Sequence, residues 1–202
     1  MLKKAFNLSK RFLPAILLFL ISSQGRSFEY VNSLEDFQAH VELHRERVVR
    51  LGMALAKEKF PEIDMVALEA FLRQHDLSKT IRRNANDLYL FYGRDGKGPE
   101  FNSIRNRINE FDQIVRNNFF AHHSEISASH QEIFYLVEHV ADLVDRGIDP
   151  VAAEEFGHKL SPASRFLKDQ RFAGFAKWLE NSYNIITQDL SLPGEHSCEK
   201  VF

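Results

Sequence analysis

The sequence contains a single cysteine, Cys198, near the end of its 202 residues. One thiol cannot form a disulfide within the chain, and it cannot build a zinc site of several cysteines. The 26 Lys and Arg residues are nearly balanced by 28 Asp and Glu residues, so bulk charge does not indicate a nucleic-acid partner. Any metal chemistry must therefore come from the nine histidines and from carboxylates.

A long hydrophobic run is also lacking, apart from residues 12–21 near the N-terminus. Basic residues precede this run, and the small residues Ser23 and Gly25 follow it, an order typical of a secretory signal peptide. The run is short for a bilayer span, which needs about 20 apolar residues. We expect residues 1–25 to be a signal peptide cleaved near Gly25, and the mature protein to be periplasmic or secreted. The alternative is an uncleaved N-terminal anchor, the only membrane contact expected.

Helical periodicity dominates the remainder, and no pair of strands is apparent. From Ser33 onward, apolar residues recur at spacings of three and four, which places them on one face of a helix. Ser33 with Asp36 resembles a capping box, and Pro61 closes the first helix. Further helices are expected at 65–74, 86–92, 104–120, 131–146, 151–156 and 163–186. The sequence predicts an all-α fold with one helical domain at 26–190 and a loose tail at 191–202.

Four polar features interrupt these helices. His44 lies in an apolar stripe where Leu would serve a core better, although a lone histidine there is more often a core residue than a ligand. His75 and Asp76 end an apolar helix, Asp142 lies on a later helix, and His122 and His123 end another. Imidazole and carboxylate together suit Mn, Fe, Co, Ni or Zn, and helical bundles project such ligands inward from facing helices. The combination predicts a metal site.

The order of these residues resembles the HD-domain superfamily of metal-dependent phosphohydrolases, over residues 35–147. The matching positions of its first helix are His44, Val48, Gly52, Leu55 and Ala56. The second element reads His75, Asp76, Leu77, Ser78 and Lys79, and the last ligand matches Asp142 in "VADLVD".

The resemblance implies an HD-type helical bundle with His44, His75, Asp76 and Asp142 on one metal ion. His122 and His123 look like the additional ligands that some branches use for a second ion, with Asp76 bridging. The chain lacks the Gly-Tyr-Pro signature of the best-known two-metal branch, so cleavage of cyclic dinucleotides is not supported.

The expected function is hydrolysis of a phosphomonoester or phosphodiester, such as a nucleotide, by water that the metal activates. Asp76 and Lys79 are the expected catalytic residues, and Lys79 would also bind the substrate phosphate. The alternative for Lys79 is a solvated residue or a charge at a helix C-terminus. One or two divalent transition-metal ions would serve, with Mg as a further choice. A di-iron oxygenase of the same fold and a catalytically inert helical binding domain are the alternatives.

The identity of the last ligand is open on helix geometry. At 100° per residue, Ile133, Val137 and Val144 define an apolar face, and Asp142 lies nearly opposite. Either this helix is buried on two sides, or Asp145 or His139 is the ligand. The arginines at positions 45, 47 and 50 are expected to form a solvated basic face.

Overall fold

The computed structural model describes residues 33–93, 101–147 and 170–190, and all regular structure in these ranges is helical. The helices are α2 (Leu34–Lys59), α3 (Met65–Leu72), α4 (Leu77–Thr80), α5 (Arg82–Gly93), α6 (Phe101–His122), α7 (Ala128–Asp145) and α10 (Gln170–Thr187). The all-α prediction is confirmed. The expected signal segment, the helix at 151–156 and the C-terminal tail lie outside the described residues. None of the described helices combines the length and apolar character needed to cross a membrane.

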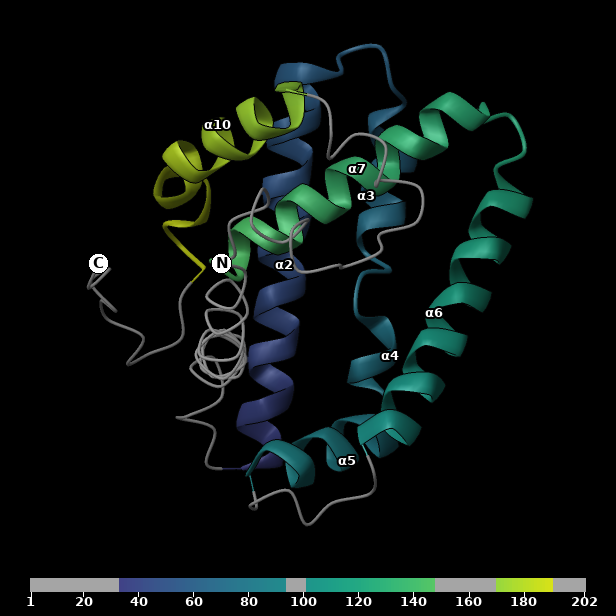
Figure 1. Cartoon of the computed structure of the whole chain (residues 1–202), viewed down its shortest axis with the longest axis vertical. Helices are drawn as coiled ribbons and strands as arrows, with labels where there is room; N and C mark the ends of the chain where they lie inside the picture. Colours follow the sequence, from purple (N-terminus) through teal and green to yellow (C-terminus); the bar gives the residue numbers. More distant parts are fainter. Residues whose placement is uncertain (1–32, 94–100, 148–169, 191–202) are drawn as a thin grey trace, which may run out of the picture.

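Helix α2 is the element around which the others pack. The Ser33 hydroxyl caps it, accepting a 3.0 Å hydrogen bond from the backbone N–H of Asp36, as the sequence predicts. The helix ends at Lys59, two residues before Pro61. Figure 1 shows α7 and α10 packed against α2, α5 beside its N-terminal end, and α3 and α4 along one side.

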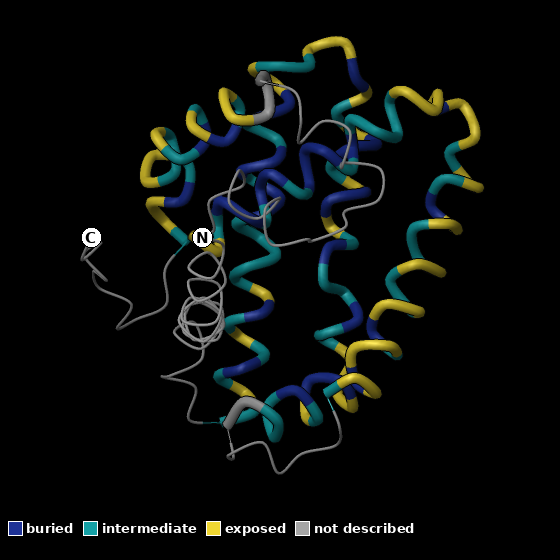
Figure 2. Tube along the Cα trace, viewed as in Figure 1, coloured by how far each residue is buried: buried dark blue, intermediate teal, exposed yellow. Residues whose placement is uncertain are grey.

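Two hydrophobic clusters lie along α2, with a polar interval between them. The larger cluster joins Val48 and the following half of α2 to α3, α7 and α10. The smaller cluster joins Phe37 and Val41 to α5 and α6. His44 falls between Val41 and Val48, so it lies at the junction of the two clusters. Figure 2 shows buried residues on the inner sides of these helices and exposed residues on the outer side of α6.

Gly52 allows close packing at the centre of the larger cluster. A Cβ atom at this position would lie 2.7 Å from Cδ1 of Leu72 on α3 and 3.2 Å from Cγ1 of Val137 on α7. A side chain here would require the Leu72 side chain to shift, so glycine allows the close approach of α2 to α3 and α7 at this point.

The predicted helices that fall within the described residues exist, but several boundaries differ. Helix α3 begins after Asp64, whose carboxylate accepts hydrogen bonds from the N–H groups of Val66 and Ala67. It ends at Leu72, two residues earlier than predicted, so His75 and Asp76 lie in a turn. Helix α5 begins at Arg82, four residues earlier than predicted. The earlier end of α3 matters most for the candidate site, because His75 and Asp76 then lie in a turn and not on a helix.

Candidate metal centre

The turn between α3 and α4 presents His75 and Asp76 toward α2. Asp76 has φ 52° and ψ 18°, the left-handed conformation, and no other non-glycine residue in the described ranges has a positive φ. This conformation costs an L-residue about 1 kcal/mol, and Asp tolerates it better than most residues do. Such local strain is common where a backbone positions functional groups.

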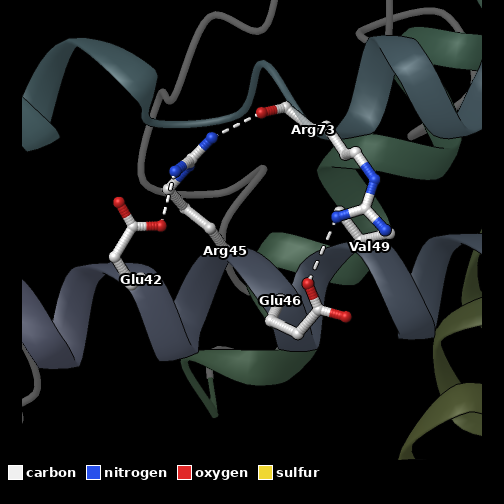
Figure 3. Close-up of a pocket in the computed structure, with 5 residues that line it drawn as sticks. All are labelled: Glu42, Arg45, Glu46, Val49 and Arg73. Atoms are coloured by element: carbon white, nitrogen blue, oxygen red, sulfur yellow. Dashed lines mark hydrogen bonds and ion pairs between the residues drawn. The ribbon is translucent and has the colours of Figure 1, made fainter.

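Arg45 holds this turn from α2. Its Nε donates a 2.8 Å hydrogen bond to the carbonyl of His75, and its Nη2 donates a 2.5 Å hydrogen bond to the carbonyl of Arg73. Figure 3 shows the Arg45 side chain rising from α2 to the Arg73 carbonyl. The turn is therefore fixed relative to the helix that carries His44.

Side-chain atoms of four residues converge at this place. Nε2 of His44 lies 3.2 Å from Nε2 of His75. Oδ1 of Asp142 lies 3.3 Å from the His44 nitrogen and 3.5 Å from the His75 nitrogen. Oδ2 of Asp76 lies 3.6 Å and 3.7 Å from the same two nitrogens. The structure therefore brings together His44, His75 and Asp142, whose ligand atoms all lie within 4.8 Å of one another. Asp76, the fourth residue that the resemblance implies, lies beside both histidines but outside this group.

The opposite nitrogen of each imidazole faces a carboxylate. Nδ1 of His44 lies 2.6 Å from Oδ2 of Asp145, and Nδ1 of His75 lies 3.0 Å from Oε1 of Glu138. A carboxylate accepts hydrogen bonds, so these contacts assign the ring protons to Nδ1. In the neutral tautomer both Nε2 atoms then direct lone pairs at each other. Only a proton or a metal cation between them makes this arrangement favourable.

The two carboxylates behind the histidines are themselves anchored. Asp145 also accepts hydrogen bonds from Nε of Arg47, at 2.7 Å, and from the hydroxyl of Tyr183 on α10, at 2.8 Å. Glu138 also accepts a 2.7 Å hydrogen bond from Arg116 on α6. Imidazole ligands of metal sites commonly have such carboxylate partners, which fix the orientation of the ring.

The donor set fits a divalent transition metal. Bonds of about 2.0–2.2 Å to a common ion place neighbouring ligand atoms roughly 3–3.5 Å apart in tetrahedral or octahedral geometry. The separations of 3.2 to 3.7 Å between the two Nε2 atoms, and between them and the carboxylate oxygens, are close to this range. His44, His75 and Asp142 form a group that could hold a metal ion. Two nitrogens with carboxylate oxygens suit Mn, Fe, Co, Ni or Zn.

Electrostatics within the cluster are strong. Burial alone lowers the pKa of His75, but the charge of Asp76 and hydrogen bonds to Asp142 and Glu138 outweigh it and raise this pKa to about 10. Burial raises the pKa of Asp76, but Lys79, His75 and His44 outweigh it and lower this pKa to about 2. Without a metal ion, the cluster therefore retains protons at neutral pH.

Two cations contact the carboxylate members of the cluster. Lys79 Nζ lies 2.5 Å from Oδ2 of Asp76, and Arg146 Nη1 lies 3.3 Å from Oδ2 of Asp142. The Lys79 side chain is 35% exposed and that of Arg146 is 41% exposed, so both reach solvent at the edge of the cluster.

His122 and His123 are not brought to this cluster. His122 is the exposed last residue of α6, and the His123 ring packs 4.4 Å from the ring of Phe119 and contacts Glu125. Figure 1 shows the C-terminal end of α6 well away from α2. The metal-ligand group found in the described part of the chain does not include either histidine.

The open question about Asp142 has a structural answer. Helix α7 is buried on two sides, because Leu136 and Leu143 are buried as well as Val137 and Val144. Asp142 therefore faces the cluster although it lies opposite one apolar stripe. Asp145 lies one turn further on and contacts Nδ1 of His44, not the side of the ring where the ligand atoms converge.

Sequence reasoning missed the anchoring residues. Arg45 and Arg47 were expected on a solvated face, but Arg45 holds the turn and Arg47 binds the buried Asp145. Glu138 was not singled out at all. The sequence does contain a pattern that indicates Glu138. Positions 138, 142 and 145 are four and three residues apart, so they present three carboxylates on one face of a helix.

A surface hollow of about 120 Å³ is lined by residues of α2 and by one residue of the turn. It is lined by Glu42, Arg45, Glu46, Val49 and Arg73. Figure 3 shows Arg45 paired with Glu42 and Arg73 paired with Glu46. Because these charges compensate one another, we assign no ligand to this hollow.

Comparisons of the chain with protein-family models, with curated proteins and with solved structures gave no match. The chemistry of the site is therefore inferred from its own residues and from the order of the motifs in the sequence.

Proposed function

We propose that this protein is a metal-dependent phosphohydrolase in which His44, His75, Asp76 and Asp142 hold one divalent transition-metal ion. The observation that carries the proposal is the pair of Nε2 atoms 3.2 Å apart, each within 3.3 to 3.7 Å of one oxygen of Asp142 and one oxygen of Asp76, with both Nδ1 atoms facing acids. The order of these residues along the chain, which resembles that of HD-domain phosphohydrolases, supports the same assignment.

A bound ion would lower the pKa of water and neutralise charge on a phosphoryl oxygen. Asp145 and Glu138 would keep both imidazoles in the tautomer that directs Nε2 inward. Asp76 and Asp142 would balance the charge of the ion. The ammonium group of Lys79, partly exposed beside Asp76, would contact a phosphoryl oxygen of the substrate and stabilise negative charge as it develops.

The geometry favours this function over the two alternatives. A di-iron oxygenase needs a second group of ligands beside the first, and His122 and His123 do not supply one in the described part of the chain. In an inert domain, no bound ion would offset the free-energy cost of desolvating two imidazoles and four acids. We therefore propose a hydrolase with a single ion.

The test is hydrolysis of an aryl phosphate monoester, an aryl phosphate diester and a nucleotide by the full chain. We expect activity with added Mn, Co, Ni or Mg and none with excess chelator. Asp142→Ala should lower it at least 100-fold with unchanged helical circular dichroism. Asp189→Asn, a control at an acid 64% exposed and paired with Arg50, should behave as wild type. Equal activity of Asp142→Ala and wild type would refute the proposal.

A further inference from the structure

The cations around the cluster fall into two groups according to the acids they bind. Arg47 and Arg116 bind Asp145 and Glu138, whose side chains are 1% and 6% exposed and lie behind the histidines. These two arginines hold the buried acids that face Nδ1 of each imidazole.

Lys79 and Arg146 bind the other two acids. Asp76 and Asp142 are 13% and 16% exposed, more than the two acids behind the histidines, and their cationic partners reach solvent. The two cations come from different elements, Lys79 from α4 and Arg146 from the C-cap of α7. The acids that they bind lie 3.6 Å and 3.3 Å from the same nitrogen, Nε2 of His44, so both cations stand at the edge of one cluster.

The charge of the loaded site follows from these pairs. The charges of a divalent ion and of the Asp76 and Asp142 carboxylates cancel, and Arg47 and Arg116 neutralise the acids that they bind. The positive charges of Lys79 and Arg146 remain. A further acid, Asp112 on α6, lies near Lys79, and burial raises its pKa. With water on the ion, the net charge of the ion and these side chains is positive whether or not Asp112 is ionised.

We propose that Lys79 and Arg146 form a two-cation clamp at the open side of the metal centre, which selects phosphate monoesters over phosphate diesters. The inference rests on the proposed function and narrows its substrate class. A monoester carries a doubly charged phosphoryl group near neutral pH, whereas a diester carries one charge. A positive surplus held by two separate cations stabilises the dianion more than the monoanion. Arg146 is thereby a substrate-binding residue, in addition to its ion pair within α7.

The experiment compares wild type, Arg146→Gln and Arg146→Lys with a matched control, Arg73→Gln. Arg73 is also an exposed arginine bound to an acid four residues away on its helix, but it lies outside the metal cluster. Each metal-loaded full-length protein is titrated with inorganic phosphate and with dimethyl phosphate at fixed ionic strength, after its metal content is measured. Hydrolysis of aryl phosphate monoester and diester is then compared by kcat/KM.

We expect Arg146→Gln to keep its metal, to bind phosphate about tenfold more weakly and to lose about tenfold of its preference for the monoester. Arg146→Lys should recover part of both, and Arg73→Gln should match wild type. Unchanged phosphate binding in Arg146→Gln, or tighter binding of dimethyl phosphate than of phosphate by wild type, would overturn the clamp. If phosphate binding weakens as expected but no ester is hydrolysed, the clamp stands and the proposed hydrolase fails.

Discussion

Asp145 lies 2.6 Å from Nδ1 of His44, although 101 residues separate the two in the chain. The same carboxylate accepts hydrogen bonds from Arg47 on α2 and Tyr183 on α10. One buried acid of α7 therefore connects three helices and sets the direction of a proposed metal ligand. The orientation of His44 depends on residues that would not touch the metal themselves.

Replacing Asp145 should weaken metal binding without removing a ligand. Asp145→Asn retains an oxygen but loses the charge that supports His44 and Arg47, and changes of this kind cost about 10- to 100-fold in metal affinity. The affinity is measured by competition with a chelator of known strength. Asp189→Asn is the control, and equal affinity in Asp145→Asn and wild type would show that Asp145 has no role in orienting His44.

Arg45 is predicted to stabilise the turn that carries His75 and Asp76. Arg45→Met keeps much of the apolar stem but removes both hydrogen bonds to backbone carbonyls. We expect the free energy of unfolding to fall by about 2 kcal/mol, with weaker metal binding as well. Denaturant unfolding and the chelator competition measure the two effects. Arg73→Gln, which removes surface ion pairs, should change neither by a comparable amount.

Metal affinity and metal-free stability should respond oppositely to pH. The pKa of His75 is about 10 in the folded metal-free protein, above its ordinary 6.5. As the pH rises, the unfolded chain therefore loses this proton at a lower pH than the folded protein does. The stabilisation is complete below about pH 6.5 and is lost as pH rises through about 10. The pKa of Asp76 is lowered to about 2, so its contribution is present above its ordinary value and is lost only as pH falls through about 2.

A metal ion must displace the histidine proton, so the apparent affinity should rise between pH 6 and pH 9. Over the same range the metal-free protein should become less stable. Titration calorimetry in buffers of different ionisation enthalpy reports the released protons, and denaturant unfolding reports the stability. Metal affinity that is constant across this range would contradict the assignment of His75 as a ligand.

The double variant His122→Ala, His123→Ala should bind as much metal as wild type, about one ion per chain. Both side chains lie apart from the cluster, and His123 contacts Phe119 and Glu125 instead. Elemental analysis of both proteins measures the ratio. About two ions per chain in wild type and about one in the double variant would instead support the second metal site that the sequence resemblance implies.

The sequence was sufficient for the helices and for the first set of candidate ligands. Apolar spacing of three and four identified each long described helix, since burial of one face is the main determinant of where a helix packs. His44 stood out because imidazole replaces an aliphatic side chain in an apolar stripe. The structure explains this position, because His44 occupies the polar interval between two hydrophobic clusters.

The remaining features depend on tertiary contacts that local patterns do not encode. Glu138 looks like an ordinary helix residue until α3 places His75 beside it. The end of α3 at Leu72 reflects the left-handed turn at Asp76, which Arg45 holds from another helix. Adjacent histidines at a helix end resembled ligands, but a helix end also leaves His122 exposed.

The most direct test of the account is the metal content of Asp76→Ala and His44→Ala beside wild type. Asp76 lies in the turn after α3 and His44 lies on α2, so a purely local helix-end role for Asp76 predicts no shared phenotype. Each purified protein is loaded with Mn or Co, freed of excess metal, and analysed for ions per chain, with circular dichroism to check the fold. We predict about one ion per chain in wild type and little in either variant, at unchanged helical signal. Full metal content in Asp76→Ala or His44→Ala would contradict the metal centre.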